Sequence, residues 1–281
     1  MALIEMNFCS RILNMNTQMT VVMPERLNGV GVRPGFYRED GKFPVLYLLH
    51  GGGGDHTDWL RYSSVERYAS ELGLALVCPA VAHSAYCNMA YGPRYADFLH
   101  EEVWELTHEM FRLSGRREDT FVAGLSMGGH GAFKWGLSQP EKFAAIGALS
   151  AGNKIAEKPL TTEQVSQFGV DFRAKRRELV YGKQDLSELL GNPEQDFFEM
   201  ARICLGEKKP LPRIFHAIGR QDHNYEGVQL TRQFFEDMPG NPFGYEYHEG
   251  EGIHSWEFWE EWIQRFLNWL VEEGLLKQKE K

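Results

Sequence analysis

The amino-acid sequence predicts an α/β fold with a mostly parallel, twisted sheet of about eight strands and helices on both faces. Short, continuously apolar segments such as VLYLL at 45–49 are typical of strands that are buried on both faces. Segments with helical spacing alternate with these strands along the chain, which favours a doubly wound sheet. At 120–132 a short strand runs through a glycine-rich turn directly into a helix.

Apolar patterning and turn residues define the elements in chain order. The turn formers Asn14, Asn16 and Thr17 separate the first two strands and predict a hairpin, and Pro79 ends the fourth strand. The first half of the chain is predicted to hold strands at 7–13, 19–23 and 43–49, a helix at 64–72, a strand at 75–78 and a helix at 97–111.

The second half continues the alternation after one interruption. It is predicted to hold a strand at 121–123, a helix at 129–138, strands at 144–149 and 214–218, a helix at 228–236, a strand at 244–247 and a helix at 256–271. Charged and helix-favouring residues dominate between 151 and 212. We interpret 152–212 as a helical insertion over the carboxyl edge of the sheet. Its charge suits a solvated face, and a flexible lid is the alternative.

The composition restricts the number of domains and the kinds of binding partner that we expect. With 281 residues, 43% hydrophobic and 25% charged, we expect one domain spanning 1–281. A net charge of −9 argues against nucleic acid, and no stretch is long enough to span a membrane. The first residues lack the pattern of a secretory signal, and four scattered cysteines favour reduced thiols, so we expect a cytoplasmic protein. Homo-oligomerisation is left open.

The sequence GLSMG at 124–128 has the G-x-S-x-G pattern of a nucleophile elbow. A sharp strand-to-helix turn lifts the serine oxygen clear of the sheet, and Gly124 and Gly128 allow close passage of neighbouring backbone because they lack a Cβ. Ser126 is therefore the candidate nucleophile. In a chain with 29 glycines this pattern is not specific by itself, so the partner residues have to support it.

A serine nucleophile needs a general base and a carboxylate that orients the base, in the chain order Ser, acid, His for this kind of elbow. His254 is the best-placed base, because it lies in a glycine-rich loop between the last predicted strand and the last helix. Asp222 follows the seventh predicted strand, in a loop that faces the elbow. Asp185 and Asp196 in the insertion are the alternative acids.

Four other titratable residues are set aside. His130 stands four residues after the serine on the same helix and cannot easily fold back to it, so we expect it to pack. His216 and His248 fall inside predicted strands, and Asp237 lies at the end of a helix that points away.

Acyl transfer also needs N–H donors for the oxygen that becomes negative, each worth about 3 kcal/mol. The N–H of Met127, directly after the nucleophile, is one candidate. The loop at 50–54 reads HGGGG, and we expect Gly52 to be the second donor, because adjacent glycines bring backbone close to a substrate. A flexible turn is the alternative explanation of these glycines.

The sequence resembles the esterase D and tributyrin-esterase-like family of α/β-hydrolases, which includes S-formylglutathione hydrolases and feruloyl and acetylxylan esterases. The matching motifs are PVLYLLHGGGGDHTDW, AGLSMGGHGA, QPEKFAAIGALSAG, IGRQD and HSWEFW, spread over nearly the whole chain. The resemblance implies the α/β-hydrolase fold, a triad of Ser126, Asp222 and His254, and oxyanion donors at Gly52 and Met127.

Within this family, the HGGGG loop, the short N-terminal strands and the closing H-S-W-x-x-W indicate a place nearer the tributyrin-esterase-like members than the S-formylglutathione hydrolases. Trp59 and Trp256 would wall an acyl or alcohol pocket, with core packing as the alternative. His130 departs from the tyrosine often found at that site.

The resemblance implies a serine carboxylesterase that needs no cofactor or metal and acts on short-chain acyl or carbohydrate-linked esters, including oligosaccharide fragments. The alternatives are a feruloyl or cinnamoyl esterase, an S-formylglutathione-type thioesterase, an acyltransferase, and a catalytically silent carbohydrate-binding protein of the same fold.

Overall fold

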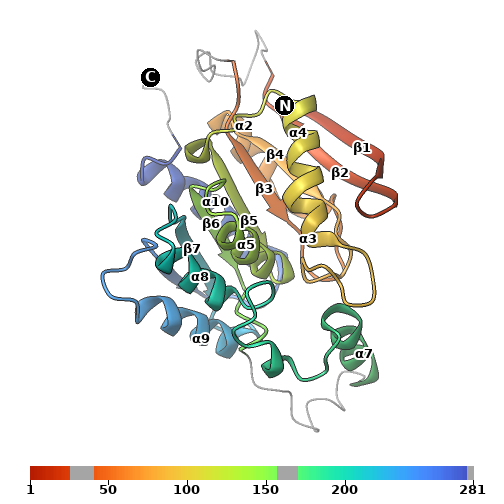
Figure 1. Ribbon diagram of the computed structural model, residues 1–281. Coiled ribbons are helices and arrows are strands. Elements are labelled where there is room, and N and C mark those ends of the chain that lie inside the picture. The colour runs from red at the N-terminus through yellow and green to blue at the C-terminus, as the bar shows by residue number, and fades with distance from the viewer. Residues whose placement is uncertain (26–40, 157–169, 277–281) are drawn as a thin grey trace.

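The computed structural model describes residues 1–25, 41–156 and 170–276, and the side chains of 170–174 are not among the parts described. An eight-stranded sheet with the order β1-β2-β4-β3-β5-β6-β7-β8 forms its centre (Figure 1). The strands are β1 (Ala2–Ser10), β2 (Met15–Met23), β3 (Val45–Leu49), β4 (Ala75–Pro79), β5 (Thr120–Leu125), β6 (Ala145–Leu149), β7 (Arg213–Gly219) and β8 (Glu246–Gly250). The strands β3 to β8 are parallel to one another, whereas β1 and β2 form an antiparallel hairpin at one edge and β2 pairs with β4 in the antiparallel direction.

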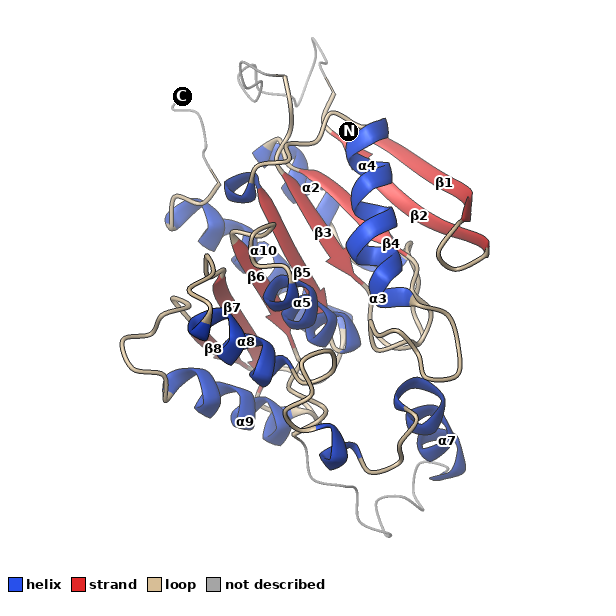
Figure 2. Cartoon of the chain, in the orientation of Figure 1, coloured by secondary structure: helices blue, strands red, loops and turns tan. Residues whose placement is uncertain are grey.

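Helices cover both faces of the sheet, as the alternating sequence predicts (Figure 2). The helices are α1 (Asp58–Tyr62), α2 (Val65–Leu72), α3 (Tyr95–Asp97), α4 (Trp104–Met110), α5 (Met127–Ser138), α7 (Val170–Tyr181), α8 (Phe197–Gly206), α9 (Tyr225–Glu236) and α10 (Trp256–Glu272). The described residues also form a π-helical stretch at Phe98–Val103 and 3-10 turns at Arg117–Asp119 and Leu186–Leu189. The helices α4, α5, α8 and α9 lie on one face, and α2 and α10 lie on the other.

The apolar strands divide their side chains between two hydrophobic cores, one on each face of the sheet. In β3, Val45, Tyr47 and Leu49 join the core beneath α5, whereas Leu46 and Leu48 join the core beneath α10. This follows from the twofold periodicity of a strand. All five side chains are buried, which explains why the segment is continuously apolar.

The first strand was predicted at 7–13, but β1 ends at Ser10 and the chain turns over 11–14. The reason is a buried carboxylate. Glu102 accepts hydrogen bonds from the backbone N–H groups of Arg11 (2.8 Å) and Ile12 (3.3 Å), so these groups bond to a side chain instead of a strand. Asn14, with φ of 54°, supplies the left-handed turn position.

The eighth strand was predicted at 244–247, and it lies at 246–250 instead. Gly244 has φ of +49°, and the N–H of Tyr245 bonds to the Asn241 side chain, so these two residues belong to the preceding loop. The helix predicted at 97–111 consists of α3, the π-helical stretch and α4 in succession. The other predicted elements are confirmed, with ends that differ by up to four residues, the largest difference being at the start of β2.

The insertion between β6 and β7 contains α7, a 3-10 turn and α8, as predicted for 152–212, although 157–169 lies outside the described residues. Phe197 of α8 stacks on Phe133 of α5 with 4.5 Å between ring centroids. The helix α7 lies beyond the carboxyl ends of β3 and β5 (Figure 1). Within the described ranges, no helix has both the length and the apolar character needed to cross a membrane.

Candidate active site

The turn between β5 and α5 places Ser126 in a strained backbone conformation. Its φ is 52° and its ψ is −118°, a region that a residue with a Cβ rarely adopts. Two hydrogen bonds hold the turn: the Ser126 N–H donates to Leu149 O (2.8 Å), and the His130 N–H donates to Ser126 O (3.1 Å). This is the strand-to-helix turn that the G-x-S-x-G pattern predicts.

The two elbow glycines are required by the approach of neighbouring backbone. A Cβ on Gly124 would lie 2.4 Å from the carbonyl of Gly128, and a Cβ on Gly128 would lie 2.1 Å from Leu49 O. Both contacts are with backbone atoms, which cannot rotate away. The elbow therefore lies directly against the end of β3.

Three side chains that are distant in the sequence meet at this elbow. His254 Nε2 lies 2.9 Å from Ser126 Oγ, and His254 Nδ1 lies 2.8 Å from Asp222 Oδ2. An ionised carboxylate only accepts hydrogen bonds, so it holds the proton on Nδ1 and leaves Nε2 to accept from the serine hydroxyl. The structure thus brings together the three residues that the sequence singled out.

The Asp222 carboxylate is buried and held by several donors. Burial raises the pKa of Asp222, but hydrogen bonds from His254, from the Asn224 N–H (2.8 Å) and from the Ser150 side chain outweigh it, so the pKa lies below its ordinary value. The Ser150 hydroxyl oxygen also accepts from Trp259 Nε1 (3.0 Å). The sequence reasoning missed Ser150 and Trp259, because no motif marks them as partners of the acid.

The alternative acids have other contacts. Asp185 is exposed and accepts from Ser187 at the start of a 3-10 turn. Asp196 caps the start of α8 and accepts from Asn153 Nδ2 (2.6 Å). Neither is bonded to the base, so the geometry favours Asp222.

The three histidines that the sequence analysis excluded as the general base have other contacts. His216 is buried in β7 between Ala151 O (2.7 Å) and Tyr245 Oη (2.8 Å), and His248 lies in β8. His130 packs on Phe197, and burial, assisted by nearby lysines, lowers its pKa to about 3. Its side chain also reaches the wall of the cavity described below, which the sequence reasoning did not predict.

The glycine loop is held from behind by His50. The Val81 N–H donates to His50 Nε2 (3.1 Å), which leaves Nδ1–H to donate to Gly51 O (2.8 Å). The Tyr86 hydroxyl donates to His50 O (2.8 Å). Burial lowers the pKa of His50, so the ring stays neutral in this role.

A cavity of about 380 Å³ opens over Ser126. Gly52 and Met127 line it, as their expected role requires, and residues of the insertion close its other side. Its lining consists of Gly52, His83, Ala85, Ser126, Met127, His130, Lys154, Arg176, Arg177, Val180, Tyr181, Leu186, His223 and Asn224. The lining residues in the described ranges include three Lys or Arg side chains and no Asp or Glu.

The cationic side of the cavity includes a histidine that stays neutral. Burial, and then the charge of Arg176, lowers the pKa of His83 to about 4. The neutral ring can accept a hydrogen bond from the guanidinium at Nε2, which lies 2.6 Å from Arg176 Nη1. Sequence reasoning missed this wall, because its cations come from two segments that carry no motif.

The two tryptophans proposed as pocket walls lie elsewhere. Trp59 is 1% exposed, and its indole N–H donates to Leu49 O (3.1 Å). Trp256 packs edge-on against it with 5.3 Å between ring centroids. Neither is among the residues that line the cavity over Ser126, so the structure favours the core-packing alternative for Trp59.

Asp222, His223 and His254 form a group whose ligand atoms lie within 4.8 Å of one another, close enough to hold a metal ion. The Asp222 oxygen and the His254 nitrogen already share a hydrogen bond, so an ion bound there would have to replace it. The donor set therefore overlaps the hydrogen-bonded chain to Ser126.

The chain is similar to known esterases over most of its length. The family model described as "Putative esterase" matches residues 21–270. An acetyl esterase of Caldicellulosiruptor saccharolyticus is 30% identical over 274 residues, which cover 96% of this chain and 98% of that protein.

Two solved structures from Staphylococcus aureus are similar over almost their whole length. The fluorophosphonate-binding serine hydrolase FphF, with substrate bound, is 32% identical with a TM-score of 0.78 and covers 99% of both chains. The S-formylglutathione hydrolase FrmB is 32% identical with a TM-score of 0.76, covering 96% of this chain and 98% of that one. Both structures are 32% identical to this chain, so the identities do not separate the tributyrin-esterase-like members from the S-formylglutathione hydrolases. The placement of this chain nearer the tributyrin-esterase-like members stays a prediction.

The family model spans most of the chain, and a relative at 30% identity covers nearly all of it. The fold agrees with that of the serine hydrolases named above. This protein therefore belongs to the esterase family of the α/β-hydrolases and is a serine carboxylesterase.

Proposed function

We propose that the protein hydrolyses small carboxylic esters through an acyl-enzyme, with Ser126 as nucleophile, His254 as general base and Asp222 as the orienting carboxylate. The observation that carries this proposal is the hydrogen-bonded chain from Ser126 Oγ through both nitrogens of His254 to Asp222. As the serine oxygen attacks the ester carbonyl, Nε2 takes its proton and then gives it to the leaving alcohol. A water molecule repeats the sequence and releases the acid.

The negative oxygen of the tetrahedral intermediate would be bound by the N–H groups of Met127 and Gly52. Met127 begins α5, and the first N–H groups of a helix lack partners within the helix and point toward anions. Gly52 stands on the loop that His50 fixes, so its N–H is positioned before substrate arrives. Each donor of this kind contributes about 3 kcal/mol to transition-state stabilisation.

The cavity supports a small substrate. Its volume of about 380 Å³ lies near the lower end of the usual range for ligand sites. The acetyl esterase and S-formylglutathione hydrolase among the relatives are both named for short acyl groups. Acetyl or similarly short esters, including those of oligosaccharide fragments, are therefore the preferred candidates. Feruloyl esters and transfer to an acceptor other than water would use the same residues.

We further infer from the cationic wall that the substrate carries an anionic group outside the reacting ester. Lys154, Arg176 and Arg177 reach the cavity from the loop after β6 and from α7. Carboxylates and phosphates are the groups that such side chains bind most strongly, through charge-assisted hydrogen bonds. The net charge of the whole chain is −9, so this wall contrasts with the chain as a whole.

The first test is a hydrolysis series with p-nitrophenyl esters from acetyl to octanoyl and with methyl ferulate, run beside Ser126→Ala. We expect turnover to be highest with a short chain and to vanish in the variant, which should also fail to react with a fluorophosphonate probe. Undiminished turnover by folded Ser126→Ala would contradict the proposed nucleophile. Labelling of the wild type without turnover of any ester would favour acyl transfer.

A further inference from the structure

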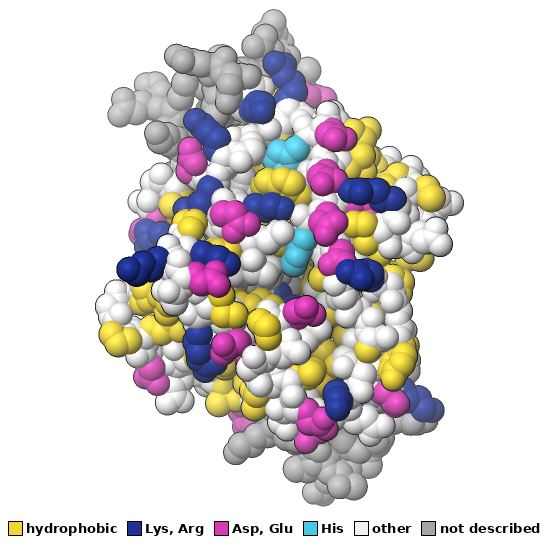
Figure 3. Space-filling model, viewed as in Figure 1, with side chains coloured by type: hydrophobic (Ala, Val, Ile, Leu, Met, Phe, Trp, Pro, Cys, Tyr) yellow, Lys and Arg dark blue, Asp and Glu magenta, His cyan; other side chains and the backbone are white. Residues whose placement is uncertain are grey.

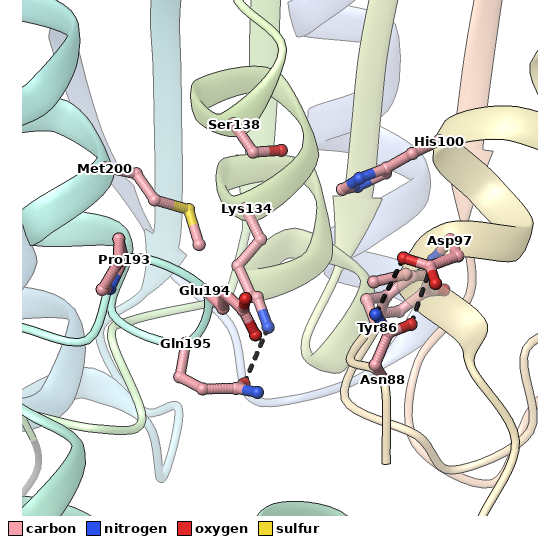
Figure 4. Close-up of a pocket in the computed structure, with 11 residues that line it drawn as sticks. Tyr86, Asn88, Asp97, His100, Lys134, Ser138, Pro193, Glu194, Gln195 and Met200 are labelled. Carbon is pink, nitrogen blue, oxygen red and sulfur yellow. Dashed lines mark hydrogen bonds between the residues drawn. The ribbon is translucent and has the colours of Figure 1, made fainter.

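A second cavity, of about 200 Å³, lies between α5, α8 and the segment that precedes α3 (Figure 4). None of its lining residues lines the cavity over Ser126. Lys134 of α5 reaches into it and is only 4% exposed, although lysine is rarely buried to this extent. Figure 4 shows its amino group directed toward the Gln195 side chain.

The partner of this buried amine is a thiol. Lys134 Nζ lies 2.8 Å from Cys87 Sγ and 3.1 Å from Gln195 Oε1, and Cys87 Sγ lies 3.0 Å from the same Oε1. The amide oxygen therefore accepts from both groups and fixes them side by side. Cys87 is fully buried, so neither group can swing away into solvent.

We propose that Cys87 and Lys134 are a modification site that hydrogen peroxide converts into a covalent bridge in which one oxygen atom joins sulfur to nitrogen, Cys–S–O–NH–Lys. This inference does not depend on the proposed esterase mechanism. A thiol oxidised to a sulfenic acid normally condenses with a second thiol or a backbone nitrogen. Here the group in contact with the sulfur is a primary amine, and their separation leaves room for one bridging oxygen.

The chemistry balances with two peroxide molecules. The first transfers an oxygen atom to the sulfur, which gives Cys–S–OH and one water. The second accepts two electrons and two protons, from the S–OH and from the neutral amine, as the O–N bond forms, and it leaves as two waters. If the amine starts as an ammonium ion, its extra proton goes to solvent.

The other cysteines are less suited to this reaction. Burial raises the pKa of the Cys78 thiol to about 12 and also raises the pKa of Cys204, and a thiol rather than a thiolate is a poor nucleophile toward peroxide. Cys9 is exposed, so it is the position at which unselective oxidation would occur. Peroxide is little larger than water, and the cavity that Lys134 lines gives it a route to the pair.

The bridge would tie the active-site surroundings together. Cys87 follows Ala85, which lines the cavity over Ser126, and Tyr86, whose hydroxyl holds the backbone of His50. Lys134 stands on α5, the helix that begins at the elbow. Oxidation would therefore fasten the segment behind the glycine loop to the elbow helix.

The test is intact-mass measurement of the purified full-length protein after graded peroxide treatment, followed by peptide mapping. We expect a species heavier by about 14 Da, the gain of one oxygen and loss of two hydrogens, with Cys87 and Lys134 in one cross-linked peptide. A thiol reductant should reverse it. Cys87→Ser and Lys134→Arg should abolish the species, whereas the matched control Cys9→Ser should retain it.

Several results would overturn the proposal. A mass gain of about 32 or 48 Da at Cys87 would indicate sulfinic or sulfonic acid instead of the bridge. A loss of about 2 Da would indicate a direct S–N bond. Absence of any reaction at Cys87 would also contradict the proposal. Persistence of the 14 Da species in Lys134→Arg would do the same. If the two site variants do not fold, the peptide map of the wild type decides between these outcomes.

Discussion

At the scale of single residues, the proposed reaction depends on which nitrogen of His254 carries the proton. The carboxylate of Asp222 accepts from Nδ1, and this leaves Nε2 with a lone pair directed at the serine hydroxyl. Ser150 and Trp259 act one step further out, because they hold the carboxylate in its place. The orientation of the base thus rests on a chain of buried hydrogen bonds.

Asp222→Asn is expected to lower kcat by about three to four orders of magnitude, because an amide can donate to Nδ1 and stabilise the wrong tautomer. Steady-state kinetics on a p-nitrophenyl ester measures the loss. The matched control is Asp185→Asn, which changes an exposed carboxylate in the insertion and should leave turnover close to that of the wild type. Full activity of Asp222→Asn would show that another group orients the base.

The sequence predicted the site residues that carry a motif, and the structure places Ser126, Asp222 and His254 together. It could not predict the wall of the cavity. Arg176 reaches this wall from a helix about fifty positions after the elbow, and only the folded chain brings it opposite Ser126. Trp59 is the reverse case: its place in the DHTDW segment suggested a pocket wall, with core packing as the alternative, and its side chain is buried in the core.

At the scale of elements, the join between β5 and α5 is the feature on which the site depends. The end of β3 lies so close to this join that there is no room for a Cβ at Gly128. The position of β3 beside β5 follows from the strand order of the whole sheet. The sequence predicted the join because the pattern is local. It did not predict the ends of β1 and β8, which are set by a distant carboxylate and by a loop bond to Asn241.

Gly128→Ala is expected to lower the free energy of unfolding by about 3 kcal/mol or more, because the new Cβ would collide with Leu49 O and the backbone must shift. Urea unfolding measures the change. The matched control is Gly206→Ala in α8, where a Cβ meets no atom within 4 Å. This variant should be neutral or more stable by up to about 1 kcal/mol, since alanine restricts the unfolded chain. Equal stability of the two variants would contradict the close approach.

The helix α7 is expected to set charge selectivity through Arg177. Arg177→Gln should lower kcat/KM for p-nitrophenyl hemisuccinate about tenfold, which is about 1.4 kcal/mol, and should leave p-nitrophenyl butyrate nearly unchanged. A second pair, phenyl acetate and 4-carboxyphenyl acetate, tests a charge on the alcohol side. The matched control is Lys175→Gln, which removes the same charge from the same helix at a residue that does not line the cavity. Equal effects on charged and neutral esters in both pairs would rule out an anionic substrate group.

At the scale of the whole molecule, charge is distributed unevenly between the outer surface and the interior. Figure 3 shows acidic side chains in a row over α4 and the stretch before it, where Glu101, Glu105 and Glu109 are exposed. Inside, several histidines are kept neutral by burial, which holds the pKa of His100 and His130 at about 3 and that of His216 at about 4. The folded protein therefore keeps these imidazoles uncharged, whereas the unfolded chain would protonate them in mild acid.

These histidines make stability fall as the pH is lowered. Their folded-state pKa values lie below the ordinary value of 6.5, so between about pH 6.5 and 4 the unfolded chain binds more protons than the folded one. The stabilisation is fully present above pH 6.5. Each such histidine removes about 1.4 kcal/mol of stability per pH unit on descending through this window. Urea unfolding at a series of pH values measures the slope.

The variant His216→Gln isolates one of these protons. A glutamine can donate to Ala151 O and accept from the Tyr245 hydroxyl, as the neutral ring does, but it does not titrate. Loss of the ring contact with Phe133 should lower stability equally at every pH, whereas the slope between pH 6.5 and 4 should decrease by up to one proton. Curves that stay parallel to the wild type would mean that His216 binds its proton equally in the folded and the unfolded chain. A shallower slope would assign part of the acid sensitivity to Nδ1 of His216, which accepts from the Tyr245 hydroxyl when the ring is neutral and takes the added proton in acid.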